Sequence, residues 1–303
     1  MQPQNHLRPE VDTMTLIQSI FMGLIQGLTE FLPVSSSGHL ALFKILFKVN
    51  TDTGMLFDVL LHIGTLIAIV VVYWRDVYKL IVELIHIIID LIYNLIAWIK
   101  ELRGERVPFR RIVCSTYRKF VVLVVVATIP TGIIGYVGRD FVTAAETILF
   151  IPGLCLIITA VILFLSDRAP AGKKGPRQIS YTNAFIVGIV QGLATLPGIS
   201  RSGSTIAASV FLGFRREFAV KFSFLMSIPA ILGALVLELH GAASMEITGA
   251  MARNYVVGMI VSAVVGYIAI KLMLVIVKKR KFTYFSIYCL VIGVISLIGY
   301  AAS

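Results

Sequence analysis

The chain alternates long apolar runs with short polar segments, which is the pattern of a membrane protein. An α-helix needs roughly 20 mainly apolar residues to cross a hydrocarbon core about 30 Å thick. Six stretches meet this requirement, and they lie near 57–74, 120–137, 148–165, 222–239, 255–277 and 282–300. The pattern therefore predicts an all-α polytopic membrane protein with six transmembrane helices.

Two further apolar regions, 14–47 and 181–214, are interrupted in the middle by a cluster of Pro, Gly and Ser residues. The cluster divides each region into two half-helices that are too short to cross the membrane. Broken backbone is tolerated at membrane depth only where protein or a water-filled cavity shields it. We therefore predict that both regions form re-entrant helical hairpins.

The two hairpins are copies of one another. Residues 23–38 (GLIQGLTEFLPVSSSG) align without a gap to residues 188–203 (GIVQGLATLPGISRSG), and seven of these sixteen positions are identical. The same offset of 165 continues into the next apolar run, as an internal repeat requires. Because each copy holds one hairpin and three crossings, the second copy is inverted relative to the first. The predicted organisation is a polar N-terminal extension (1–13), a first repeat (14–166), a linker (167–180) and a second repeat (181–303).

Composition and charge agree with a membrane protein and exclude other classes. A hydrophobic content of 58%, a charged content of 14% and a mean hydropathy of +0.91 exclude a soluble fold. Basic residues outnumber acidic ones, 27 to 16, but they lie between the apolar runs, so we predict no nucleic acid partner. In the inverted repeat, 20 of the 27 basic residues fall on one face. By the positive-inside rule that face is cytoplasmic, which places both termini and the mouth of the first hairpin outside.

One apolar segment, near 80–99, does not fit the scheme of six spans. Its polar residues Glu83, His86, Asp90 and Asn94 recur at steps of three and four, which places them on one stripe of a helix. Two carboxylates facing lipid would be costly. We therefore predict an amphipathic surface helix rather than a seventh span.

The first hairpin carries a carboxylate near the depth of the bilayer. Gln26 and Glu30 are four residues apart, so they share one face of the first half-helix. An ionisable residue at this depth is a candidate functional group, although neutralisation by Lys271 or protonation is an alternative. Mg²⁺ takes few protein oxygens and shares its other ligands with phosphate and water, so Gln26 and Glu30 are candidate metal ligands.

After Pro33 the chain reads Ser35, Ser36, Ser37, Gly38, His39. Ser36 and His39 are three apart and share a helix face, as a nucleophile and its base would. The alternative is a histidine whose hydrogen bonds are satisfied within the protein core.

The second hairpin carries an arginine at the position that corresponds to Ser36. Its loop runs from Pro197 to Thr205, with Arg201 between Ser200 and Ser202. A guanidinium at membrane depth needs an anion, and the half-helix that follows directs its N–H groups and positive dipole end to the same place. A phosphate meets this need, whereas an ion pair with Glu30 is the structural alternative. Inversion brings both loops to the membrane midplane, which predicts a site for a phosphorylated lipid.

Over nearly its whole length the chain resembles the undecaprenyl-diphosphate phosphatases of the bacitracin-resistance type. The resemblance is carried by Gln26 to Glu30 followed by Pro33 to His39, and by Pro197 to Thr205. It implies a catalytic set of Glu30, Ser36, His39 and Arg201. It places around them Gln26 as a metal ligand beside Glu30, and as phosphate-binding residues Ser35, Ser37, Gly198, Ser200, Ser202 and Thr205.

The implied activity removes the terminal phosphate of undecaprenyl diphosphate with a divalent cation, Mg²⁺ or Ca²⁺. This would recycle the lipid carrier of peptidoglycan synthesis at the outer side of the bacterial plasma membrane and confer bacitracin resistance. Undecaprenyl diphosphate and membrane lipid are the implied partners, and a homodimer is left open. The nucleophile is also left open between Ser36, His39 and water. A transporter or flippase of a phosphorylated prenyl lipid is the alternative, because inverted repeats with broken helices also build transporters.

Two departures from the family pattern stand out. Gln26 occupies a position that the family often fills with Glu, which removes one negative charge from the metal site. The stretch 80–119 is longer than usual for the family.

Overall fold

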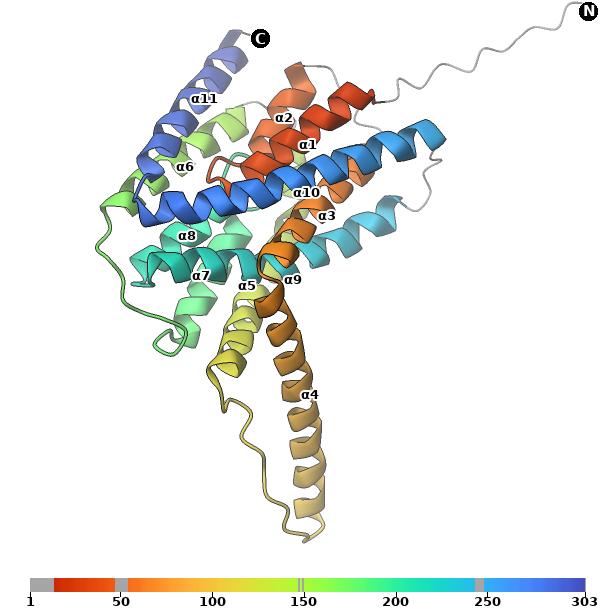
Figure 1. The fold of residues 1–303 in the computed structure, drawn as a ribbon, viewed down its shortest axis with the longest axis vertical. Coiled ribbons are helices and arrows are strands. Elements are labelled where there is room, and N and C mark those ends of the chain that lie inside the picture. The colour runs from red at the N-terminus through yellow and green to blue at the C-terminus, as the bar shows by residue number, and fades with distance from the viewer. Residues whose placement is uncertain (1–13, 47–53, 147, 149, 243–247, 303) are drawn as a thin grey trace, which may run out of the picture.

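The computed structural model describes residues 14–46, 54–146, 148, 150–242 and 248–302. Over these residues the chain folds into eleven helices with no strand (Figure 1). The predicted N-terminal extension, 1–13, lies outside the described residues. The helices are α1 (Leu16–Phe31), α2 (Ser36–Leu46), α3 (Gly54–Val72), α4 (Trp74–Leu102), α5 (Thr116–Glu146), α6 (Phe150–Arg168), α7 (Tyr181–Leu193), α8 (Arg201–Phe211), α9 (Arg216–Ala242), α10 (Gly249–Lys278) and α11 (Phe282–Ala302).

Six of these helices are long and apolar enough to cross a membrane, so the chain is a multi-pass membrane protein, as predicted. They are α4, α5, α6, α9, α10 and α11. Five of them match predicted spans. The sixth, α4, contains the predicted surface helix. The span predicted near 57–74 corresponds to the apolar helix α3, which has 19 residues, the same number as the candidate span α6. The candidate spans therefore differ from the prediction in that they include α4.

Each predicted hairpin consists of two short helices, α1 with α2 and α7 with α8. The longest of the four has 16 residues, about 24 Å, which is shorter than the hydrocarbon core. Both hairpins begin with the same capping box, Thr15 with Gln18 and Ser180 with Asn183. The offset of 165 also relates these caps. The structure is therefore compatible with re-entrant hairpins, whose depth in the membrane stays a prediction.

The packing of the helices follows the repeat. Helix α1 packs on α10 and its counterpart α7 packs on α5, while α3 packs on α10 and its counterpart α9 packs on α5. Helices α6 and α11, which correspond to one another, form a pair. Exchanging the two copies therefore exchanges equivalent contacts.

Two pairs of glycines allow this close packing. Gly23 and Gly27 lie on α1, and the equivalent Gly188 and Gly192 lie on α7. A Cβ at Gly23 would lie 2.5 Å from a carbonyl oxygen of α10, and one at Gly188 would lie 2.1 Å from a carbonyl oxygen of α5. Small residues four apart let helix backbones approach one another in membranes. This explains why the glycines are among the positions that are identical in the two copies.

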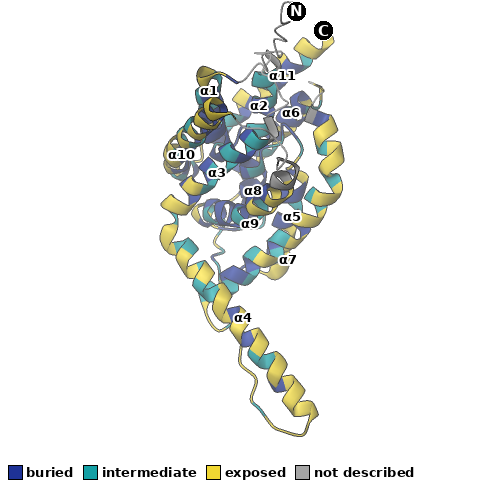
Figure 2. Ribbon diagram, turned by 90° about the vertical axis from the view of Figure 1, so that its right-hand side faces the viewer, coloured by how far each residue is buried: buried dark blue, intermediate teal, exposed yellow. Residues whose placement is uncertain are grey.

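Helix α4 leaves the body of the molecule, and most of its residues are exposed (Figures 1 and 2). Only Ile87, Asp90 and Ala97 are buried along it. Residues 103–115 return to α5 without forming a helix.

We expect Gly188→Ala to lower the thermal unfolding midpoint of the purified protein, because the new Cβ would overlap a backbone carbonyl that cannot move aside. Overpacking of this kind costs about 1–3 kcal/mol. Gly138→Ala in α5 is the matched control, because nothing lies within 4 Å of a Cβ at that position. Alanine favours a helix by about 1 kcal/mol over glycine, so the control should be neutral or stabilising. Equal midpoints for the two variants would contradict the role given to Gly188.

Candidate active site

The loops of the two hairpins cross one another. A Cβ on Gly38 would lie 3.1 Å from the Cα of Gly198, and a Cβ on Gly203 would lie 3.0 Å from the Cβ of Pro33. The offset of 165 relates Pro33 to Gly198 and Gly38 to Gly203. Exchanging the two copies therefore converts one of these contacts into the other. A pseudo-twofold axis therefore passes between the loops, and it brings together the two motifs that the sequence singled out.

The ionised groups of the two motifs meet at Glu30. Its Oε2 accepts hydrogen bonds from Ser36 Oγ at 2.6 Å and from Gln26 Nε2 at 3.1 Å. Its Oε1 accepts a charged hydrogen bond from Arg201 Nη2. Glu30 is buried, and a buried carboxylate requires such partners.

The ion pair between Arg201 and Glu30 is the structural alternative that the sequence left open for this arginine. Lys271, the other cation considered for Glu30, lies instead over the ring of Tyr267, 5.6 Å from its centre. The side chain of Arg201 is 21% exposed, compared with 5% for Glu30. The side chain of Arg201 therefore keeps some exposed surface, whereas that of Glu30 is almost fully covered.

His39 does not face Ser36. Its Nδ1 lies 2.7 Å from the backbone oxygen of Ser35, and its Nε2 lies 2.8 Å from the hydroxyl of Tyr288. The rings of His39 and Tyr288 stack 5.5 Å apart. Because the backbone oxygen can only accept, Nδ1 carries the hydrogen, and Nε2 of the neutral ring accepts from Tyr288. The group placed to take a proton from Ser36 is the Glu30 carboxylate.

Ser35 and Ser200 occupy equivalent positions in the two copies, and their side chains make equivalent hydrogen bonds. Ser35 Oγ accepts from the backbone N–H of Gly38 at 3.3 Å, and Ser200 Oγ accepts from that of Gly203 at 3.1 Å. Each hydroxyl also lies 3.4 Å from that of the serine two residues later, Ser37 or Ser202. Both serines are buried. They cap α2 and α8 and so organise the two loops around the site.

Gly198 forms the turn of the second loop. Its φ of +94° is in the left-handed region that favours glycine. Its carbonyl oxygen accepts from Thr159 Oγ1 at 3.1 Å, and Thr159 Oγ1 accepts in turn from the N–H of Ser200 at 3.0 Å. No sequence signal pointed to Thr159, because it lies on α6 outside both motifs.

Thr205 lies one turn into α8 and is buried there. Its Oγ1 donates to the carbonyl oxygen of Arg201 at 2.8 Å and lies 2.6 Å from the hydroxyl of Ser223 on α9. Ser204 Oγ, next to it, is buried and has no hydrogen-bond partner among the described residues. Thr205 therefore fixes the first turn of α8, the turn that carries Arg201.

The donor set suits a cation that takes few ligands from the protein. Gln26 Oε1 is buried without a hydrogen-bond partner in the described part of the chain, beside Glu30. An exchange of the amide oxygen and nitrogen of Gln26 would turn that oxygen toward Glu30. Among the described residues no three His, Cys, Asp or Glu side chains gather into a metal cluster. Glu30 and Gln26 thus fit an ion such as Mg²⁺, which completes its shell with phosphate and water.

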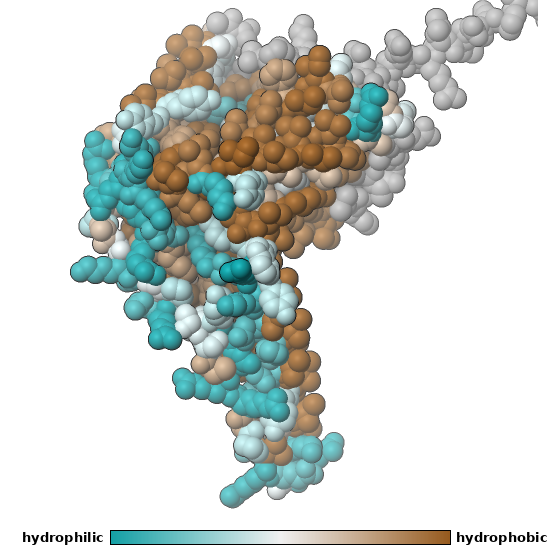
Figure 3. Space-filling model, in the orientation of Figure 1, coloured by the Kyte–Doolittle hydropathy of each residue, from teal (hydrophilic) through white to brown (hydrophobic). Residues whose placement is uncertain are grey.

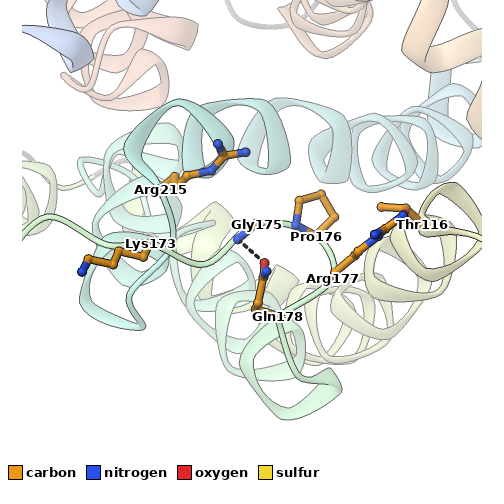
Figure 4. Close-up of a pocket in the computed structure, with 7 residues that line it drawn as sticks. All are labelled: Thr116, Lys173, Gly175, Pro176, Arg177, Gln178 and Arg215. Carbon is orange, nitrogen blue, oxygen red and sulfur yellow. Dashed lines mark hydrogen bonds between the residues drawn. The ribbon is translucent and has the colours of Figure 1, made fainter.

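A surface pocket lies elsewhere, between the linker and the starts of α5 and α9 (Figure 4). Its Gln178 Oε1 accepts from the N–H of Gly175 at 2.9 Å and closes a turn of the linker. The pocket contains none of the predicted site residues. Its lining residues are Thr116, Lys173, Gly175, Pro176, Arg177, Gln178 and Arg215.

Comparison with known proteins agrees with the resemblance seen in the motifs. The model of the family described as "Bacitracin resistance protein BacA" matches residues 19–295. A protein of Methanosphaera stadtmanae named undecaprenyl-diphosphatase is 42% identical over 287 residues, 93% of this chain and 97% of that relative. One of the same name from Alkaliphilus metalliredigens is 41% identical, over 94% of this chain and 98% of the relative. This chain belongs to the BacA bacitracin-resistance family.

Proposed function

We propose that this protein hydrolyses undecaprenyl diphosphate to undecaprenyl phosphate and phosphate at the crossing of the two hairpin loops. The observation that carries the proposal is the cluster in which Glu30 accepts from both Ser36 and Arg201. It combines a hydroxyl nucleophile, a base and a phosphate-binding cation at one point. The name undecaprenyl-diphosphatase, shared by relatives about 40% identical to this chain, supports undecaprenyl diphosphate as the substrate.

Arg201 binds the terminal phosphate in this proposal. It is the first residue of α8, so its guanidinium and the free N–H groups of that helix end act on the same anion. When the phosphate binds, Arg201 pairs with it instead of with Glu30. The Glu30 carboxylate is then free to act as a base. The ion pair with Glu30 holds the guanidinium in place until then.

Ser36 is the nucleophile that the geometry favours. Its Oγ forms a bond to the terminal phosphorus as the anhydride P–O bond breaks, and Glu30 takes the hydroxyl proton. Undecaprenyl phosphate leaves with the electron pair of the broken bond. Water then attacks the phosphorus of the phosphoserine, and the bond from phosphorus to Ser36 Oγ breaks. Glu30 returns its proton to Ser36 Oγ, and the attacking water leaves as part of the released phosphate. His39 and Tyr288 hold the start of α2 against α11 and thereby position Ser36.

Gln26 and Glu30 would hold the divalent cation, Mg²⁺ or Ca²⁺. When bound, the cation offsets the negative charge that develops on the phosphate oxygens.

We further propose that the site opens to the outer side of the plasma membrane. Segments that carry many of the basic residues contact one another: Lys119 Nζ donates to Arg177 O at 2.6 Å, and Arg216 Nη2 donates to Ser166 O at 2.9 Å. We call the face on which these segments meet the basic face. By the positive-inside rule this face is cytoplasmic, so in this proposal the site opens on the other side.

We expect Arg201→Lys to lower kcat by roughly 10²–10³, because a lysine cannot reproduce the two parallel hydrogen bonds of a guanidinium to phosphate. The measurement is phosphate release from undecaprenyl diphosphate by the purified, folded variant. Arg139→Lys, at an exposed pair with Asp140, is the control and should leave kcat unchanged. A transporter that uses Arg201 only to attract an anion would tolerate lysine, so turnover within a few-fold of the parent would contradict the phosphatase role.

We expect Ser36→Ala to lower turnover by about 10³ or more, because it removes the nucleophile. Thr143→Ala, which removes an exposed hydroxyl of α5 outside the site, is the control and should retain the activity. Rapid quenching with substrate labelled in its terminal phosphate should trap a labelled protein in the parent and none in Ser36→Ala. Substantial turnover by Ser36→Ala would instead assign the attack to water.

We expect Glu30→Gln to abolish hydrolysis and Gln26→Glu to retain it. The second change places two carboxylates on one helix face, so half-maximal activity should need a lower concentration of Mg²⁺ or Ca²⁺. Calorimetric titration with the cation provides a readout independent of turnover. Gln191→Glu, at the equivalent position of α7, adds the same charge away from Glu30 and should not change the cation dependence. Normal hydrolysis by Glu30→Gln would move the metal site elsewhere.

A further inference from the structure

Helix α4 and its return segment, residues 103–115, form an arm that projects from the helical body (Figure 1). The arm begins at the basic face, where Lys221 Nζ of α9 donates to Asp76 Oδ1 of α4 at 2.7 Å. None of the residues assigned to catalysis lies on it. The arm therefore takes no direct part in the proposed hydrolysis.

The arm has two chemically different sides. In Figure 3 hydrophobic residues line one side of it along its length, and hydrophilic residues line the other. At 100° per residue, the large apolar residues of α4 that are at least 38% exposed cover about half of the helix circumference. These residues include Ile81, Leu84, Ile85, Ile88, Ile92, Leu95 and Ile99.

The return segment covers the polar side only. Arg110 exchanges two hydrogen bonds of 2.8 Å with the side chain of Asn94, through its own backbone N–H and carbonyl oxygen. Its guanidinium lies 3.2 Å from Asp90, and Arg118 bonds Asp90 at 2.6 Å and Glu83 at 3.0 Å. The polar stripe of α4 is therefore paired within the chain, whereas its apolar side packs on nothing in the described structure.

These contacts are incompatible with a transmembrane α4. The return segment is tied to the helix at Asp90 and Asn94, so it would accompany α4 through the hydrocarbon. Irregular backbone exposed to lipid does not occur at that depth. Arg103, Arg106 and Arg111 are exposed on this segment and would be placed in or across the bilayer.

We propose that the arm lies in the plane of the membrane, on the leaflet at the basic face, and binds anionic lipid headgroups. The apolar side of α4 enters the boundary between headgroups and acyl chains, as an interfacial amphipathic helix does. Arg103, Arg106 and Arg111 have no ion pair among the described residues, and they attract the anionic headgroups. A neutral lipid surface would leave this excess of arginine without a complement.

The chain supplies its own probe for this proposal. It contains two tryptophans, Trp74 and Trp98, and both lie exposed on α4. Replacing both with Phe and adding Ile88→Trp places a single tryptophan in the middle of the apolar side, and its emission is excited selectively over that of the 11 tyrosines. The full-length protein is reconstituted in vesicles whose lipids carry bromine either near the headgroup or near the bilayer centre. Stronger quenching by the shallow bromine is expected, while stronger quenching by the deep bromine, or no quenching, would overturn the in-plane placement.

Headgroup preference is tested in the same vesicles. With a small fraction of brominated lipid, we expect roughly twofold or greater quenching by phosphatidylglycerol than by phosphatidylcholine, decreasing as salt is added. Replacing Arg103, Arg106 and Arg111 with Gln should remove the preference. The matched control replaces Lys278, Lys279 and Lys281 with Gln, which removes the same charge outside the arm and should retain it. Equal quenching by both lipids in the parent protein would overturn the headgroup assignment.

The side of the membrane on which the tip lies gives an independent check. In a Cys114→Ser background, a cysteine at Glu105 should react with an impermeant reagent from the same side as one at Lys173 in the linker. Reaction from opposite sides would mean that α4 crosses the bilayer.

Discussion

The ion pair between Glu30 and Arg201 is the interaction on which the rest of the site depends. It joins the end of α1 to the start of α8, two elements that lie 171 residues apart in the chain. Breaking one side of a buried pair costs about 3–5 kcal/mol, because the remaining charge has no partner. Each hairpin therefore neutralises the other, and neither loop could hold its charged group at this position alone.

The crossing of the loops makes this pairing possible. Glycines at Gly38 and Gly198 allow the two backbones to approach closely, and caps from Ser35 and Ser200 start the two helices that diverge from the crossing. Ser35, Gly198 and Ser200, which the sequence suggested as phosphate ligands, thus shape the two loops. The Ser36 hydroxyl and the Arg201 guanidinium instead bond Glu30, and the amide oxygen of Gln26 has no hydrogen-bond partner in the described part of the chain.

The sequence predicted this arrangement where the information is local or repeated. Apolar runs, the Pro and Gly breaks and the offset of 165 led to the helices, the paired hairpins and the meeting of the two motifs. Contacts between distant segments left no such signal. Tyr288 reaches His39 from 249 residues away, and Thr159 reaches the second loop from α6, so no motif could identify them. For α4, length and hydropathy favour a span, whereas the polar stripe in the sequence predicts a surface helix. Its pairing with the return segment, which the sequence did not reveal, supports the place at the surface.

The repeat also shows how far the two copies have diverged. Gln191 sits on α7 where Gln26 sits on α1, and each keeps a buried amide oxygen without a partner among the described residues. Four residues later the first copy has Glu30, whereas the second has Thr195. The second copy therefore keeps the buried glutamine but lacks the carboxylate. Conversely, the first copy has Ser36 at the position where the second has Arg201. The two copies therefore share a scaffold but differ at the positions that carry charge, so the pseudo-twofold axis relates an acidic half to a basic half rather than two equal sites.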